Sequence, residues 1–136
     1  MKILLDTNIV VDVLSRRGGY EESLQVLRYC EMRKVEGIAS TATIMDVMYI
    51  MRKHMDAGKM RDAVRTFLTL VDVVEIRESD ILAALDSEMS DFEDAVQAFC
   101  SKRNRADYIV TRNKKDFTYS PVPALLPGEM LSLFEE

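Results

Sequence analysis

The chain has 136 residues, of which 48% are hydrophobic and 30% are charged, and it contains only three prolines and five glycines. This length and composition predict one globular domain over residues 1–136 and exclude a disordered or fibrous protein. The formal net charge of −5 argues against a general electrostatic coat for DNA, so binding of a nucleic acid would need local basic patches.

Hydrophobic patterning and cysteine spacing favour a cytoplasmic protein. The apolar run Ile3–Leu5 is interrupted by Asp6, so no signal peptide is expected, and no apolar stretch reaches the roughly 18 residues that span a membrane. Cys30 and Cys100 lack the CxxC spacing that is typical of zinc or redox sites. We expect both cysteines to be reduced side chains in the core.

Short apolar runs alternate with amphipathic segments along the chain. The first run, Met1–Leu5, ends in the polar turn Asp6–Asn8 and is typical of a buried parallel strand. Further strands are predicted over Gly37–Ser40, Val71–Ile76, Tyr108–Thr111 and Pro121–Pro127. Helices are predicted where apolar side chains recur at helical spacing, over Leu24–Lys34, Thr41–Gly58, Met60–Leu68, Ser79–Leu85, Asp91–Arg105 and Glu129–Phe134.

The alternation of strands and helices predicts an α/β fold, a three-layer α/β/α sandwich around a central, mostly parallel sheet. Ligands of such sheets bind beyond the carboxyl ends of the strands, near the switch in strand order. Asp6 and the loop after Thr111 both stand at such ends. We therefore expect any functional site to lie there.

Acidic side chains occupy several of these positions, and each has an ordinary structural explanation. Asp6 can form a turn or cap a helix, and Asp91 and Asp94 are favoured at a helix N-terminus. Asp46 lies within a predicted helix, where a short acidic side chain lowers helix propensity, although it could face solvent. The loop Asn113–Asp116 could be a simple polar turn. Considered one by one, these residues leave the function open.

Three stretches together resemble the PIN domain family, in order and across essentially the whole chain. They are Asp6-Thr7-Asn8, the segment Asp91–Gln97 and the segment Asp107–Phe117. The resemblance implies a parallel sheet between helices, Mg²⁺ or Mn²⁺ bound by three or four acidic residues, and metal-dependent cleavage of RNA. Many bacterial members are VapC-type toxins held by an antitoxin, so RNA and an antitoxin protein are the expected partners. We also expect a homodimer.

The resemblance assigns catalytic and metal-binding residues position by position. Asp6 matches the family's first metal ligand, and Asp94 matches the acidic residue at the start of the late helix. The second acidic position, usually glutamate, falls on Asp46, whose side chain is one methylene shorter. The fourth, often aspartate, falls on Asn113, with Asp116 as an alternative ligand. These two departures imply that a second ion binds weakly or only with substrate.

Other polar residues could support this site. Asn8, Ser40 and Thr111 stand at or just beyond strand ends, where they could hold a carboxylate or position a water, or could cap helices and close turns. His54 offers no partner arrangement and is expected at the surface. Basic side chains that could guide an RNA backbone, or that could remain solvated charges, are Arg16, Arg17, Arg112, Lys114 and Lys115.

Two other functions remain open. A PIN-fold module that binds RNA or a protein partner but cuts poorly is favoured by the departures at Asp46 and Asn113. A phosphate-handling α/β protein, either a receiver-like regulator or a phosphatase of the haloacid-dehalogenase type, also sets an aspartate at a strand end. The phosphatase is disfavoured because Asn8 stands where its second aspartate should be, and the regulator because the expected acidic pair after the first strand is missing.

Overall fold

The computed structural model describes residues 1–16 and 18–135, so Arg17 lies outside the described residues. Within them, the sheet has five strands in the order β3-β2-β1-β4-β5, and every neighbouring pair is parallel. The strands are β1 (Lys2–Leu5), β2 (Glu36–Ser40), β3 (Asp72–Val74), β4 (Tyr108–Val110) and β5 (Ala124–Leu125). The predicted parallel sheet with β1 at its centre is therefore confirmed.

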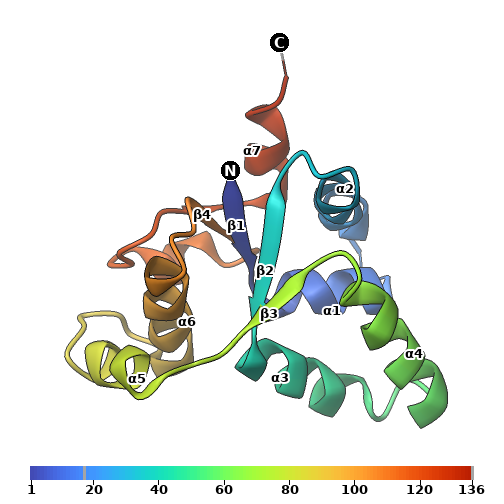
Figure 1. The fold of residues 1–136 in the computed structure, drawn as a ribbon, viewed down its shortest axis with the longest axis horizontal. Helices are drawn as coiled ribbons and strands as arrows, with labels where there is room; N and C mark the ends of the chain where they lie inside the picture. The colour runs from blue at the N-terminus through green and yellow to red at the C-terminus, as the bar shows by residue number, and fades with distance from the viewer. Residues whose placement is uncertain (17, 136) are drawn as a thin grey trace.

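Helices cover both faces of the sheet and give the molecule three layers (Figure 1). One face packs against α1 (Thr7–Ser15), α2 (Tyr20–Glu31), α3 (Thr41–Met51), α4 (Ala57–Phe67) and α7 (Pro127–Ser132). The other face packs against α5 (Glu78–Leu85), α6 (Phe92–Arg103) and the short 3₁₀ helix η1 (Lys114–Phe117). The predicted α/β/α sandwich is confirmed.

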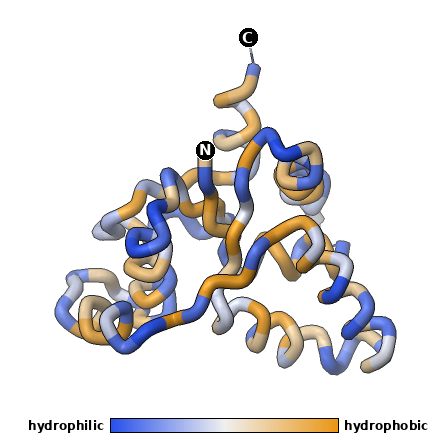
Figure 2. Tube along the Cα trace, in the orientation of Figure 1, coloured by the Kyte–Doolittle hydropathy of each residue, from blue (hydrophilic) through white to orange (hydrophobic). Residues whose placement is uncertain are grey.

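The central strand β1 divides its side chains between two hydrophobic cores. Ile3 and Leu5 belong to the core shared with α1 to α4, whereas Leu4 belongs to the core shared with α5 and α6. Successive side chains of a strand point to opposite faces, so a strand that is covered on both sides must be apolar throughout. Hydrophobic segments accordingly run through the centre of the molecule, and polar segments lie at turns and outer helix faces (Figure 2).

The start of α1 corrects the first predicted turn. Residues Asp6–Asn8 do not form a turn between elements, because α1 begins at Thr7. Asp6 is its N-cap, and its Oδ1 accepts a hydrogen bond from the Thr7 backbone N at 2.8 Å. A carboxylate in this position satisfies a helix N–H that has no partner within the helix. The strand end and the helix cap are therefore the same residue.

Other boundaries also differ from the prediction. The helix predicted over Ser79–Leu85 begins one residue earlier, at Glu78, after the N-cap Arg77. The expected strand over Pro121–Pro127 is reduced to β5, because prolines lack the N–H that a strand ladder needs. The closing helix begins earlier than expected, at Pro127, a residue that is favoured at the first helical position.

Two simpler expectations hold, for the cysteines and for His54. Cys30 and Cys100 are buried and free of disulfides, at 5% and 0% exposure. His54 is exposed, as predicted. In the part of the chain that the structure describes, none of the helices is both long and apolar enough to cross a membrane.

Candidate metal centre

The candidate site lies where β1 and β4 end, at the switch in strand order. The chain leaves β1 towards β2 on one side, while β4 lies on the other side of β1. The Asp6 backbone N donates to the Val110 carbonyl at 3.0 Å, which holds the two strand ends together. Crevices of this kind are the usual binding places of open parallel sheets.

Asp6 is the best-anchored carboxylate of the site. It is only 6% exposed, and its Oδ2 accepts hydrogen bonds from Thr111 Oγ1 at 2.8 Å and from Asn8 Nδ2 at 3.2 Å. Thr111 Oγ1 in turn accepts from the Asn113 backbone N at 3.1 Å. Burial raises the pKa of Asp6; these hydrogen bonds oppose the rise, and the charge of Asp116 adds to it. The loop after β4 is thus fastened to a carboxylate 105 positions earlier in the sequence.

Acidic side chains gather around Asp6 in one cavity of about 370 Å³, which we call the acidic cavity. Its lining residues are Asp6, Thr7, Asn8, Val11, Ile50, Asp91, Glu93, Asp94, Asn113 and Asp116. Asp91 and Asp94 come from the start of α6, where the Asp94 backbone N donates to Asp91 Oδ1 at 2.9 Å. Asp116 comes from η1. Among the residues that the structure describes, the lining therefore combines several carboxylates with no basic side chain.

Burial, hydrogen bonding and repulsion between carboxylates together raise the pKa of two acidic residues of this cavity. Burial raises the pKa of Asp94 to about 7, and the charges of Asp6, Asp91 and Asp116 contribute to the rise. A hydrogen bond with Asp46 raises the pKa of Glu93 to about 7, together with burial and the neighbouring acidic charges. Carboxylates held this close either keep protons near neutral pH or share a cation.

A hydrated divalent cation fits this donor set. Among residues 1–16 and 18–135, no three acidic, histidine or cysteine side chains converge closely enough to hold one ion together. Mg²⁺ does not require such a cage, because it keeps several waters and is commonly bound through one or two carboxylates. Asp6 and Asp94 could supply direct oxygens, and Asp116 and Asn113 could hold the ion's waters.

Most of the predicted acidic and amide residues line the acidic cavity, but one does not. Asp6, Asn8, Asp94, Asn113 and Asp116 all line the acidic cavity. By contrast, Asp46 is not part of the lining and reaches it only through its contact with Glu93.

The two predicted hydroxyl residues, Ser40 and Thr111, also have different roles. Ser40 is fully buried and caps α3, with its Oγ accepting from the Thr43 backbone N at 3.2 Å. It therefore serves the helix rather than a cavity carboxylate. Thr111 contacts the Asp6 carboxylate directly and orients it.

The predicted basic residues have different environments. Arg112 Nη1 contacts both carboxylate oxygens of the fully buried Asp12, at 3.0 and 3.1 Å, so much of its charge is engaged inside the protein. Lys114 pairs with Glu129 at 2.9 Å. Lys115 is exposed and makes no ion pair within the described residues. Of these three, Lys115 is the cation best placed to meet an external phosphate.

A second hollow adjoins the acidic cavity, and we call it the basic groove. It has a volume of about 670 Å³ and is lined by Arg112, Asn113, Lys114, Lys115, Phe117, Thr118, Pro123, Ala124 and Leu126. Asn113 belongs to both linings. A surface with cations over apolar side chains therefore begins where the acidic cavity ends.

Sequence reasoning missed Glu93 and Asp12. Glu93 stands between Phe92 and Asp94 in the first turn of α6, where an acidic residue is ordinary, so only the contact with Asp46 distinguishes it. Asp12 is the single charge in the apolar stretch Ile9–Leu14. That isolation is a signal that could have predicted a buried ion pair.

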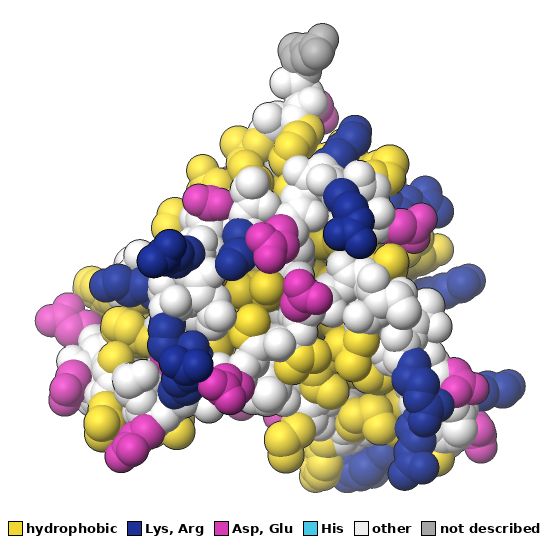
Figure 3. Space-filling view, viewed as in Figure 1, with side chains coloured by type: hydrophobic (Ala, Val, Ile, Leu, Met, Phe, Trp, Pro, Cys, Tyr) yellow, Lys and Arg dark blue, Asp and Glu magenta, His cyan; other side chains and the backbone are white. Residues whose placement is uncertain are grey.

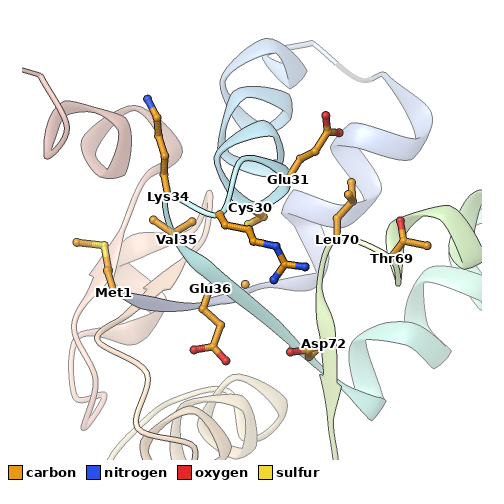
Figure 4. Close-up of a pocket in the computed structure, with 11 residues that line it drawn as sticks. Met1, Cys30, Glu31, Lys34, Val35, Glu36, Thr69, Leu70 and Asp72 are labelled. Atoms are coloured by element: carbon orange, nitrogen blue, oxygen red, sulfur yellow. The ribbon is translucent and has the colours of Figure 1, made fainter.

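A cavity at the opposite edge of the sheet offers a contrast. It has a volume of about 440 Å³ and lies where β2 and β3 begin (Figure 4). Its lining mixes the cations Arg33 and Lys34 with the anions Glu31, Glu36 and Asp72. Two cations there offset most of the charge of three anions, whereas the described lining of the acidic cavity has carboxylates and no cation. The acidic cavity is therefore the stronger candidate for binding a metal ion.

Comparisons with known proteins agree with this architecture. A chain of the Rickettsia felis VapBC2 complex, solved bound to a DNA fragment from its promoter, superposes with a TM-score of 0.71 at 16% identity, covering 93% of this chain and 98% of that chain. A chain of a Klebsiella pneumoniae toxin–antitoxin complex gives 0.69 at 25% identity, covering 92% and 97%. Mycobacterium tuberculosis VapC20, described as a toxin that cleaves the sarcin-ricin loop, gives 0.60 at 13% identity, covering 79% and 86%.

The sequence itself places the chain in a family. No curated protein matches it. A family model described as "PIN domain" matches residues 2–115, which include β1, α6, β4 and most of the acidic cavity. The structural neighbours named above have the same fold. The chain belongs to the PIN domain family.

Proposed function

We propose that this protein is a Mg²⁺- or Mn²⁺-dependent endoribonuclease and the toxin of a toxin–antitoxin pair. The observation that carries the proposal is the electrostatic coupling of Asp6, Asp94 and Asp116 around one cavity, whose lining within residues 1–16 and 18–135 holds no basic side chain. Such a site favours a divalent cation, and PIN domain proteins are typically nucleases. VapC20, a neighbour in fold, is described as cleaving an RNA loop.

Four residues of the site would take part in hydrolysing a phosphodiester. A bound Mg²⁺ or Mn²⁺ supplies a more acidic water and neutralises charge on the phosphate. Asp6, oriented by Thr111 and Asn8, and Asp94, at the start of α6, would hold the ion. Water oxygen forms a new bond to phosphorus as the bond to the leaving oxygen breaks. No serine, cysteine or histidine nucleophile is needed.

The RNA strand would enter along the basic groove. Lys115 offers a free positive charge to a phosphate, and Phe117 and Leu126 offer apolar surface beside it. Because Asn113 lines both hollows, a phosphate bound next to Lys115 would lead the strand into the acidic cavity. Phosphate contacts of this kind position a strand without reading its sequence.

An antitoxin is the second proposed partner. The Rickettsia and Klebsiella neighbours were both solved as toxin–antitoxin complexes. A small DNA-binding protein encoded next to this chain should therefore copurify with it and suppress RNA cleavage.

The homodimer stays a prediction. Hydrophobic side chains gather at the lower edge of the face in Figure 3, over α3. On this helix Met45 and Tyr49 are 72% and 65% exposed, and light scattering would test whether the protein associates in solution.

A binding module with little cleavage is the alternative, and one observation favours it. Asn113 brings an uncharged amide to the acidic cavity, and Asp46 lies outside the lining. Fewer direct carboxylates would weaken a second ion, and cleavage would then be slow while RNA binding remained.

Cleavage of a labelled single-stranded RNA separates the two functions. The wild type should cut in Mn²⁺ and not in EDTA, and Asp6→Asn should abolish cutting while circular dichroism shows a folded protein. Asp62→Asn is the matched control, because Asp62 is an exposed acid on α4 that pairs with Arg65 and should leave cleavage unchanged. RNA that stays intact with the wild type, although it binds, would favour the binding module.

A further inference from the structure

A buried chain of polar side chains links three of the helices around the acidic cavity. Gln97 on α6 donates from Nε2 to Thr43 Oγ1 on α3 at 2.6 Å. Thr43 Oγ1 lies 3.0 Å from Thr7 Oγ1 on α1, and either hydroxyl can be the donor. Gln97 and Thr43 are 1% and 0% exposed. We call this the Gln97–Thr43–Thr7 chain.

Both ends of the Gln97–Thr43–Thr7 chain lie next to a carboxylate of the proposed metal centre. Thr7 lines the acidic cavity, and its backbone N donates to Asp6 Oδ1 at 2.8 Å. Gln97 follows Asp94 by three residues, which places the two side chains on neighbouring positions of one helix face. The hydrogen bonds therefore run from the turn that carries Asp94 to Thr7, the first residue of α1, next to its N-cap Asp6.

Stability does not explain a glutamine at this position. Gln97 Oε1 is buried and has no hydrogen-bond partner among the described residues. An unsatisfied buried oxygen costs about 1 to 3 kcal/mol, whereas an apolar side chain of similar size would avoid the cost. Buried polar groups that are kept despite such a cost call for a functional explanation.

We infer that Gln97 is a positioning residue for the metal centre. Through Thr43 and Thr7 it fixes α6 relative to α1, and so fixes the spacing between the Asp94 and Asp6 carboxylates that an ion must bridge. A small change in this spacing would replace one direct ligand by a water. The inference rests on the proposed function, because it requires a divalent ion between these carboxylates.

Gln97→Met tests the inference with Mn²⁺ affinity as the readout. Methionine keeps the length of the side chain and removes both polar atoms. Losses of supporting hydrogen bonds around metal ligands typically lower affinity by about 10- to 100-fold, and we expect a loss in this range by isothermal titration calorimetry with MnCl₂. The metal-free melting temperature should be equal to or higher than that of the wild type, since the unsatisfied oxygen is gone.

Two further variants and one control complete the experiment. Thr43→Val, which removes the central hydroxyl, should lose affinity as Gln97→Met does, and Thr43→Ser, which keeps it, should bind Mn²⁺ like the wild type. Gln25→Met on α2 makes the same chemical change away from the Gln97–Thr43–Thr7 chain and should leave the Mn²⁺ affinity unchanged.

Wild-type Mn²⁺ affinity in Gln97→Met would overturn the inference. A lower metal-free melting temperature in Gln97→Met would also overturn it, because Gln97 would then be a packing residue. If the wild type itself binds no Mn²⁺, the proposed function fails first and the inference falls with it.

Discussion

Replacing Asp94 by asparagine should stabilise the metal-free protein and weaken its binding of Mn²⁺. Asp94 carries one of the raised pKa values of the acidic cavity, about 7 in place of 3.8, because it is partly buried and near Asp6, Asp91 and Asp116. Its carboxylate makes no hydrogen bond within the described residues, so the substitution removes charge without removing such a contact. Any gain in stability therefore measures the cost of burying this charge, together with its repulsion from Asp6, Asp91 and Asp116.

The magnitude follows from the pKa of Asp94. The difference between 3.8 and about 7 corresponds to at most about 4 kcal/mol of unfolding free energy once the group is ionised. Water screens part of the repulsion at a half-buried side chain, so we expect about 1 to 2 kcal/mol. For 136 residues this raises the melting temperature by about 4 to 7 °C.

The pH dependence has a definite sign. A carboxyl whose folded pKa is raised binds its proton more tightly in the folded state, so metal-free wild type should be most stable below the unfolded pKa of 3.8 as far as Asp94 is concerned. This contribution is lost as the pH rises from 3.8 through about 7. Asp94→Asn should flatten that decline.

Differential scanning calorimetry in EDTA, and then in Mn²⁺, measures both effects. At Mn²⁺ about 100-fold above its dissociation constant, the wild type should gain about 2.7 kcal/mol, and Asp94→Asn should gain much less. Asp62→Asn, an exposed acid on α4, should behave as the wild type in both buffers. A metal-free Asp94→Asn that melts lower than the wild type, or one that keeps the full Mn²⁺ gain, would refute the reasoning.

Three other substitutions should act at single contacts. Arg112→Met removes the guanidinium from the buried Asp12, which keeps other contacts such as the hydrogen bond from Ser23, and should lower the unfolding free energy by about 1 to 3 kcal/mol in urea titrations; an unchanged unfolding free energy would contradict a stabilising role for the pair. Lys115→Ala should leave stability unchanged and weaken metal-free binding of single-stranded RNA, with a smaller dependence on salt; an unchanged salt slope would exclude a phosphate contact. Gly37→Ala should cost about 1 to 3 kcal/mol, because its Cβ would lie 2.7 Å from Cys30 Sγ, and an unchanged melting temperature would show that the core yields.

The local sequence pattern was sufficient to predict the sheet and part of the site. A strand that is covered on both faces must be apolar, so Met1–Leu5 could be recognised as the central strand before any contact was known. Parallel strands bring their carboxyl ends to one edge, which predicted that Asp6 and the loop after Thr111 would meet. Boundaries were less accurate where one residue serves two elements, as Asp6 does at the start of α1.

The electrostatic partners could not be predicted in this way. Three contacts depend on how segments from distant parts of the chain pack around the sheet. They are the ion pair of Arg112 with Asp12, the contact of Asp46 with Glu93 and the hydrogen bond of Gln97 with Thr43. Composition and periodicity determine which face of a helix is buried, and therefore predicted the fold and the strand ends where Asp6 and the loop after Thr111 lie. The other acidic residues of the site were predicted by the resemblance to the PIN domain family. Only the tertiary structure decided which charges are neutralised and which remain to bind a cation, because Coulomb and hydrogen-bond energies depend on distances that no local pattern encodes.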